Sequence, residues 1–125
     1  MLGSKGLLWS VFIATGLFGA TNVRADDTVK IGEIEALTGP TATYGWMSAQ
    51  GTKLAVDEIN AKGGFKVGDK TYKLELIQAD TRGEPREATV QFRKMMEENV
   101  RFVFGPFLTN IFNAIEPIAN QNSGK

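Results

Sequence analysis

The sequence predicts an α/β fold with a parallel sheet that carries helices on both faces. Short runs of β-branched and aromatic residues alternate three times with longer segments of helical periodicity. Each run ends in a loop rich in Gly, Pro, Thr or Asp. Because strands that alternate with helices are joined by right-handed crossovers, we expect the three strands to be parallel.

The first unit begins with the strand VKIGEI, residues 29–34, which is rich in β-branched residues. The loop ALTGPTATYG, residues 36–45, follows, and its Gly39-Pro40 step stops the strand. A helix then ends at Gly63-Gly64, a left-handed stop signal. Helical spacing predicts its buried face as Met47, Gly51, Leu54, Ala55 and Ile59.

The second unit has its strand at residues 72–77. Gly68-Asp69 predicts a tight turn that pairs residues 65–67 with this strand as a small hairpin. The next helix begins at Pro85, where a missing N–H costs nothing. Its apolar stripe is Ala88, Phe92, Met95 and Met96, and we interpret the methionines as core filler rather than a functional surface.

The third unit has its strand at residues 102–105 and a helix that starts near Thr109. Phe112, Ile115, Ile118 and Ala119 recur at core spacing, while Pro117 predicts a kink or an early end. With the strand order 2-1-3, the connections after the first and third strands leave on opposite faces of the sheet. That arrangement is a switch point, where open α/β sheets bind ligands.

The first 25 residues are typical of a secretory signal: Lys5, then a mostly apolar stretch at residues 6–20, with cleavage expected after Ala25. An uncleaved anchor is the less favoured alternative, because the stretch is shorter than the ~20 apolar residues that span a bilayer. Of the 14 basic residues, Lys5 and Arg24 would leave with the leader, so 12 remain against 14 acidic ones. This balance disfavours nucleic acid as a partner.

The residue inventory argues against catalysis. The chain has no histidine and no cysteine, and it lacks the GxSxG, GxxxxGK[ST] and GxGxxG motifs. We therefore predict no catalytic residue, no metal, no cofactor and no enzyme activity. Glu33 and Glu35 are interpreted as solvated or capping side chains. For Asp80 we favour capping of a loop or helix over ligand contact.

Three segments in this order carry a resemblance to a known family: TGPTATYG at residues 38–45, INAKGG at 59–64 and FVFGPFLTN at 102–110. The chain resembles the periplasmic branched-chain amino acid-binding proteins, the leucine/isoleucine/valine-binding type that serves ABC importers. The resemblance implies the amino-terminal part of a type I periplasmic-binding-protein lobe. We expect residues 1–25 to be the signal peptide and residues 26–125 an incomplete lobe, so that the sequence is a fragment.

The resemblance also implies site residues. In the family, the residues after the third strand's glycine receive the ligand's carboxylate and apolar part, and they map onto Phe107, Leu108 and Thr109. Tyr44 matches a tyrosine that lines the pocket near the ligand's side chain. From the residues alone, Thr109 would be an ordinary helix N-cap and Tyr44 a partly buried loop aromatic. Phe107 is bulkier than expected, and Trp46 is a weaker candidate.

The resemblance thus implies a soluble periplasmic solute-binding protein that takes a branched-chain or related amino acid and delivers it to the permease subunits of an ABC importer. The alternative is a ligand-sensing domain for an amide, urea or another small molecule, built on the same fold. The absence of cysteine fits a protein without an acylated membrane anchor. We expect the rest of the binding cleft to come from a second lobe.

Overall fold

The computed structural model describes residues 28–122, so the predicted leader and its cleavage site lie outside the described residues. Strands and helices alternate as the sequence predicts. In chain order the elements are β1 (Thr28–Glu35), α1 (Ala42–Ala61), β2 (Phe65–Val67), β3 (Lys70–Asp80), α2 (Pro85–Glu97), β4 (Phe102–Phe104) and α3 (Thr109–Asn122).

The four strands form one sheet in the order β2-β3-β1-β4. Strand β1 pairs in parallel with β3 on one side and with β4 on the other. The predicted order of the three parallel strands is therefore confirmed, as β3-β1-β4. The hairpin strand β2 is also confirmed; it runs antiparallel to β3 and makes the sheet mixed.

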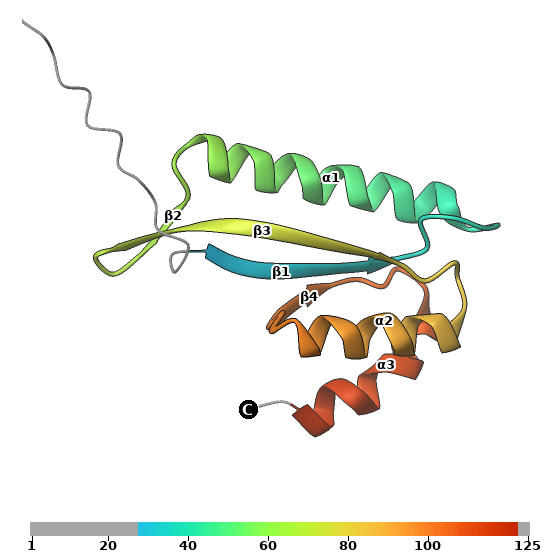
Figure 1. Cartoon of the computed structure of the whole chain (residues 1–125). Coiled ribbons are helices and arrows are strands. Elements are labelled where there is room, and N and C mark those ends of the chain that lie inside the picture. The colour runs from blue at the N-terminus through green and yellow to red at the C-terminus, as the bar shows by residue number, and fades with distance from the viewer. Residues whose placement is uncertain (1–27, 123–125) are drawn as a thin grey trace, which may run out of the picture.

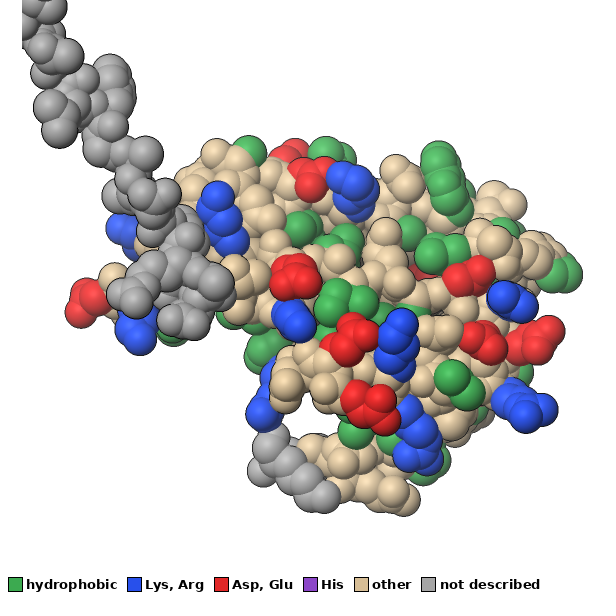
Figure 2. All heavy atoms as spheres, viewed as in Figure 1, with side chains coloured by type: hydrophobic (Ala, Val, Ile, Leu, Met, Phe, Trp, Pro, Cys, Tyr) green, Lys and Arg blue, Asp and Glu red, His purple; other side chains and the backbone are tan. Residues whose placement is uncertain are grey.

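The helices cover both faces of the sheet, as predicted. Helix α1 lies along one face, and α2 and α3 lie on the other (Figure 1). The connections after β1 and β4 therefore leave on opposite faces, which is the condition for a switch point. Over the face seen in Figure 2, Lys and Arg side chains are interspersed with Asp and Glu, so this face carries no patch of a single charge.

The main core lies between the sheet and the pair α2 and α3. Strand β1 contributes Ile34, and the predicted stripe of α2 is confirmed, with Met96 only partly buried. Gly32 of β1 leaves room for α2, because a Cβ there would lie 2.8 Å from the sulfur of Met95. The buried members of this cluster are Ile34, Ala79, Ala88, Phe92, Met95, Val100, Ile111, Ile115 and Ile118.

The predicted buried face of α1 is wrong. Met47 and Leu54 are 62% and 61% exposed, while the buried residues of the helix are Gly45, Ala49 and Val56. The two stripes are offset by about two residues, which is roughly 200° around a helix. Both have helical spacing, so periodicity alone could not choose between them; α1 buries the stripe of small residues that lets it approach the sheet.

Helix α3 begins at Thr109 as expected, but two details differ. Ile115 and Ile118 are buried and Ala119 packs against the core as predicted, but Phe112 is exposed and Ile111 is fully buried in its place. The helix also continues past Pro117 to Asn122, so the expected early end is not observed. Packing of Ile111, Ile115 and Ile118 against α2 stabilises the helix beyond the proline.

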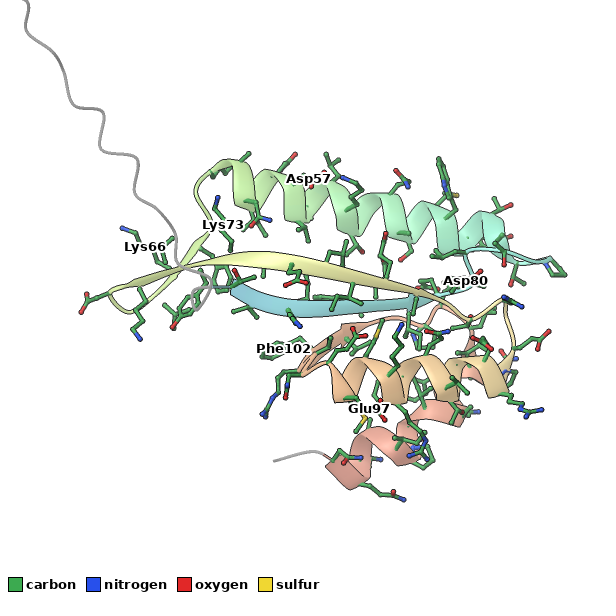
Figure 3. All side chains as sticks on the ribbon, in the orientation of Figure 1. Asp57, Lys66, Lys73, Asp80, Glu97 and Phe102 are labelled. Atoms are coloured by element: carbon green, nitrogen blue, oxygen red, sulfur yellow. The ribbon has the colours of Figure 1, made fainter. Side chains whose placement is uncertain are left out.

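A groove of about 620 Å³ lies beside β4, between α2 and α3. Within the described residues, β4 pairs with β1 alone. The aromatic side chains of Phe102 and Phe104 on this strand are exposed, and Figure 3 shows Phe102 at the start of β4, partway along the sheet from Asp80. The residues that line the groove include Phe92, Met96, Val103, Phe112, Ile115 and Ala119.

The predicted stop after α1 is confirmed. Gly63 and Gly64 have φ values of 93° and 102°, a region that favours glycine. A Cβ on Gly64 would lie 2.1 Å from the carbonyl oxygen of Tyr72, so the chain passes β3 too closely for a side chain. Just before the stop, the Asn60 amide donates to the Leu74 carbonyl and accepts from the Leu74 N–H, at 2.8 and 2.9 Å. This pair of bonds ties the end of α1 to the free side of β3.

Candidate functional site

The candidate site lies where the carboxyl ends of β1 and β4 meet. The two strands are paired in register, with Glu33 opposite Phe104. The loop of residues 36–41 therefore emerges beside the turn of residues 105–108. Because α1 and α3 leave on opposite faces, the edge between them is open to a ligand.

The structure brings Tyr44 and Phe107 together across this edge. Their ring centroids are 5.4 Å apart and their planes are inclined by 12°, which is a stacked pair. The rings come from the first turn of α1 and from the turn after β4, 63 positions apart in the sequence. Both side chains stay largely exposed, at 59% and 63%. The pair offers an apolar surface at the mouth of the site.

Tyr44 is placed by close packing of the residue that follows it. A Cβ on Gly45 would lie 2.1 Å from the carbonyl oxygen of Ala36, so only glycine lets the first turn of α1 lie against the end of β1. Trp46, one residue further on, is exposed.

Asp80 fixes the loop after β1. Its Oδ1 accepts the backbone N–H groups of Leu37, Thr38 and Arg82 at 2.8 to 3.2 Å, and its Oδ2 accepts the Thr38 hydroxyl at 2.6 Å. Partial burial raises the pKa of Asp80, but these hydrogen bonds outweigh burial and hold the pKa below its usual value. The prediction of a loop-capping role is confirmed, and Figure 3 shows Asp80 where β3 meets the loops.

Leu108 and Thr109 lie at the start of α3. The Leu108 carbonyl accepts the N–H groups of Ile111 and Phe112, so Leu108 occupies the N-cap position and Thr109 is the first residue of the helix. The predicted N-cap at Thr109 is therefore wrong by one residue. The Leu108 side chain is partly buried against the core, and Thr109 is exposed. The first N–H groups of a helix lack partners within it, which suits an anion.

Of the two roles expected for Glu33 and Glu35, the solvated one is wrong; the capping one fits Glu35, which accepts a backbone N–H of the turn after β4. The two side chains are 1% and 3% exposed, and both extend from β1 toward α1. Glu33 accepts the hydroxyls of Ser48 and Thr52 and the amide of Gln78, at 2.8 to 3.2 Å. These bonds let α1 cover a buried carboxyl group, which explains why the helix buries small and polar residues there.

Glu35 lies beneath the turn after β4. Its Oε2 accepts the backbone N–H of Phe107 at 3.1 Å. Burial and the nearby Glu33 carboxyl raise the pKa of Glu35, while the bonds from Phe107 and Ser48 act in the opposite direction. Sequence reasoning missed this contact. The available signal was two acids spaced two residues apart inside an apolar strand, which places both on one face.

Between residues 28 and 122, no cluster of three or more carboxylate side chains is arranged to hold a metal ion. No helix in the same range is long and apolar enough to span a bilayer. The arrangement therefore consists of two aromatic rings, a helix start with an exposed threonine, and the carboxyl groups of Asp80 and Glu35, which accept backbone N–H groups of the neighbouring loops. Such groups suit the binding of a small molecule with an apolar part and an anionic part.

Comparisons with known proteins agree with this geometry. The chain is 39% identical over 94 residues to the Leu/Ile/Val-binding protein BraC3 of Rhizobium johnstonii; the match covers 75% of this chain and 24% of that protein. The chain thus spans about a quarter of the length of this curated relative. The relative is named as a binding protein.

Solved structures show the same fold. The branched-chain amino acid transporter substrate-binding protein LivJ of Streptococcus pneumoniae, in complex with isoleucine, is 33% identical with a TM-score of 0.68, over 75% of this chain and 26% of that one. An ABC transporter solute-binding protein of Rhodopseudomonas palustris, in complex with 3,4-dihydroxybenzoic acid, is 27% identical with a TM-score of 0.64, over 76% and 25%.

A family model described as periplasmic binding protein matches residues 28–123. The match begins with β1 and includes every strand and helix of the structure. The agreement of sequence, topology and solved relatives confirms the resemblance that the three segments carried. The chain belongs to the periplasmic binding protein family.

Proposed function

We propose that the chain is the amino-terminal part of a solute-binding protein that serves an ABC importer in the periplasm, and that its ligand is a branched-chain or related amino acid. The observation that carries the proposal is the Tyr44–Phe107 stack at the switch point, beside the start of α3. This pair joins two loops that the sequence separates, and in the proposed complex it forms one wall of the ligand cleft.

In the proposed complex, the ligand's carboxylate lies at the start of α3. It accepts the hydroxyl of Thr109 and the backbone N–H groups of the first turn, which satisfy an anion without a counter-charge. The ligand's apolar part lies against Tyr44 and Phe107, with Leu108 between the cleft and the core. A second lobe supplies the opposite wall and a partner for the ammonium group.

The proposed mechanism is hinge closure without chemistry. The ligand binds one lobe, the second lobe closes over it, and only the closed form presents the surface that the permease subunits recognise. The solved relatives named as transporter binding proteins support this role.

Calorimetry on the full-length protein tests the proposal. The panel contains leucine, isoleucine, valine, threonine, aliphatic amides, urea and aromatic acids. We expect saturable binding of at least one branched-chain or related amino acid. If no compound in the panel binds, the result contradicts the importer hypothesis. Binding of an amide or urea alone would favour the sensor alternative, which a membrane or signalling segment elsewhere in the full-length sequence would also support.

An aromatic acid is the second candidate ligand. Phe107 is bulky and stacks on Tyr44, and the Rhodopseudomonas palustris relative binds 3,4-dihydroxybenzoic acid. A flat ring could extend this stack. If benzoate derivatives bind at least tenfold more tightly than leucine, the ligand assignment moves to aromatic acids and the transport role stays.

The substitution Thr109→Val tests the carboxylate contact. Because it removes a hydroxyl from a charged partner, we expect a loss of about 1.5–3 kcal/mol in binding free energy, measured by calorimetry with the best ligand of the panel. Thr89→Val is the matched control: it makes the same change in the first turns of α2, where the hydroxyl bonds the Pro85 carbonyl away from the cleft. An unchanged affinity for Thr109→Val would return Thr109 to a purely structural role.

A further inference from the structure

The Glu35 carboxyl joins the end of β1 to the turn that carries the proposed site residues. Glu35 is the last residue of β1 and is almost fully buried. Its Oε2 accepts the N–H of Phe107, a residue 72 positions away in the sequence. The same turn passes over the other carboxyl oxygen, because a Cβ on Gly105 would lie 2.8 Å from Oε1.

We propose that Glu35 is a positioning residue of the ligand site, which sets the backbone of the turn at residues 105–108 and thereby the Tyr44–Phe107 wall. The proposal rests on the proposed function, since it assigns a role toward the ligand that this wall contacts. Glu35 itself is covered by the turn and has no contact with the ligand.

The backbone of Phe107 has to be held in place because its side chain makes few contacts that would fix it. The ring is mostly exposed and has the stack with Tyr44 as its aromatic contact. The residue before it, Pro106, has no N–H to donate. The N–H of Phe107 is therefore the polar group through which the middle of the turn is fixed, and Glu35 accepts it.

The buried position of Glu35 affects the ionisation of its carboxyl group. Burial raises the pKa of Glu35, and so does Glu33 on the same strand. Asp80 lies opposite Glu35 on β3, α1 contributes the Ser48 hydroxyl, and residues 102–108 carry no titratable side chain. A pKa raised by folding means that the contribution of Glu35 to stability is fully present below its unfolded pKa and is lost as the pH rises through its folded value.

At neutral pH the ionised form therefore costs folding stability, yet an ionised carboxyl is the stronger acceptor for the Phe107 N–H. Neutral glutamine keeps an acceptor oxygen and nearly the same shape. It should relieve the cost of burying a charge while keeping the turn in place. Alanine removes the acceptor and leaves the N–H unpaired.

The first experiment measures ligand affinity in the full-length protein with the best compound of the calorimetric panel. We expect Glu35→Ala to weaken binding about tenfold, which corresponds to ~1.4 kcal/mol, and Glu35→Gln to stay within about threefold of the unmodified protein. Glu33→Ala is the matched control: it removes a buried acid from the same face of β1 that bonds α1 and β3 but not the turn. We expect it to lower stability and to change the affinity less than threefold.

The second experiment remains decisive if Glu35→Ala fails to fold. The amide proton of Phe107 is followed by NMR in the full-length protein as the pH rises from 4 to 8. We expect a downfield shift with a midpoint above the ordinary glutamate value of 4.5, because the ionised carboxyl is the stronger acceptor. Glu35→Gln should remove this transition.

The proposal and the function on which it rests fail in different ways. If the unmodified protein binds no compound of the panel, the proposed function fails and the NMR titration still reports whether Glu35 holds the turn. If the unmodified protein binds and Glu35→Ala binds equally well, or weakens no more than Glu33→Ala, the positioning role is overturned. A Phe107 amide that does not titrate, or titrates unchanged in Glu35→Gln, overturns it as well.

Discussion

On the face covered by α2 and α3 the sheet meets a continuous apolar cluster, whereas on the face covered by α1 it meets two buried carboxyl groups. Strand β1 serves both faces: Gly32 and Ile34 point to the cluster, and Glu33 points to the hydroxyls of α1. One face is stabilised by apolar burial and the other by satisfied polar groups. The polar face is also the one from which Glu35 reaches the turn of the candidate site.

This difference explains where sequence reasoning succeeded. The stripe of α2 was predicted correctly because apolar residues on that helix face an apolar cluster. The stripe of α1 was predicted wrongly because its apolar residues Met47 and Leu54 point outward, while Ser48 and Thr52 face Glu33. Periodicity identifies a buried face only where the opposing surface is apolar.

The largest expected effect on stability comes from a substitution in the apolar cluster beneath α2 and α3. Ile34→Ala truncates a fully buried side chain between β1 and the helices α2 and α3, and we expect a loss of about 2–5 kcal/mol in the free energy of unfolding. Urea denaturation of the full-length protein measures it. Leu54→Ala on the outer side of α1 is the control and should change stability by less than about 0.5 kcal/mol. Equal losses would mean that α1 buries the other stripe after all.

A smaller effect tests the close approach of α1 to the sheet. A Cβ at Gly45 would meet the Ala36 carbonyl at 2.1 Å, so Gly45→Ala forces the helix outward, and we expect a cost of about 1–3 kcal/mol. Gly51→Ala lies in the same helix with open space around its Cβ, and should stabilise the protein by about 0.4–1 kcal/mol. Thermal unfolding of both variants gives the comparison. Opposite signs support the packing described, and two stabilised variants would contradict it.

The smallest effect concerns the loop beside the polar face. Asp80→Ala removes the acceptor of four hydrogen bonds in a partly exposed place, so we expect a loss on the order of 1 kcal/mol at neutral pH. Because hydrogen bonding holds the pKa of Asp80 below its ordinary value of 3.8, its contribution is present above that value and is lost as the pH falls through the folded pKa.

Unfolding measured from pH 7 down to pH 2 should therefore bring Asp80→Ala and the unmodified protein together at the acidic end. Asp80→Asn keeps the oxygen that accepts three of the four bonds, and should retain part of the stability at neutral pH. A constant difference between Asp80→Ala and the unmodified protein at every pH would contradict the assignment.

Some features of the candidate site could be predicted from the sequence, and others could not. Tyr44 and the residues 107–109 could be placed at one edge of the sheet from the sequence, since the parallel order 2-1-3 brings the loops after the first and third strands together. The stacking of Tyr44 on Phe107 came only from the structure. The loop-capping role of Asp80 also followed from its position at a strand end. The contact between Glu35 and Phe107 could not be predicted, because it depends on how closely the turn at Gly105 passes over the end of β1.

The sequence by itself determined the order of elements, the parallel pairing, the hairpin, the glycine stop after α1 and the membership of the family. The structural features follow from local propensity, turn chemistry and connection rules, which act between residues close in the chain or in consecutive units. The family was indicated instead by the resemblance of three segments, and the family model confirms it. Only the tertiary structure decided which face α1 buries, that Ile111 and not Phe112 lies in the core, and that Glu33 and Glu35 are buried. Those outcomes depend on the shape and polarity of the opposing surface, which exists only once the strands and helices are packed together.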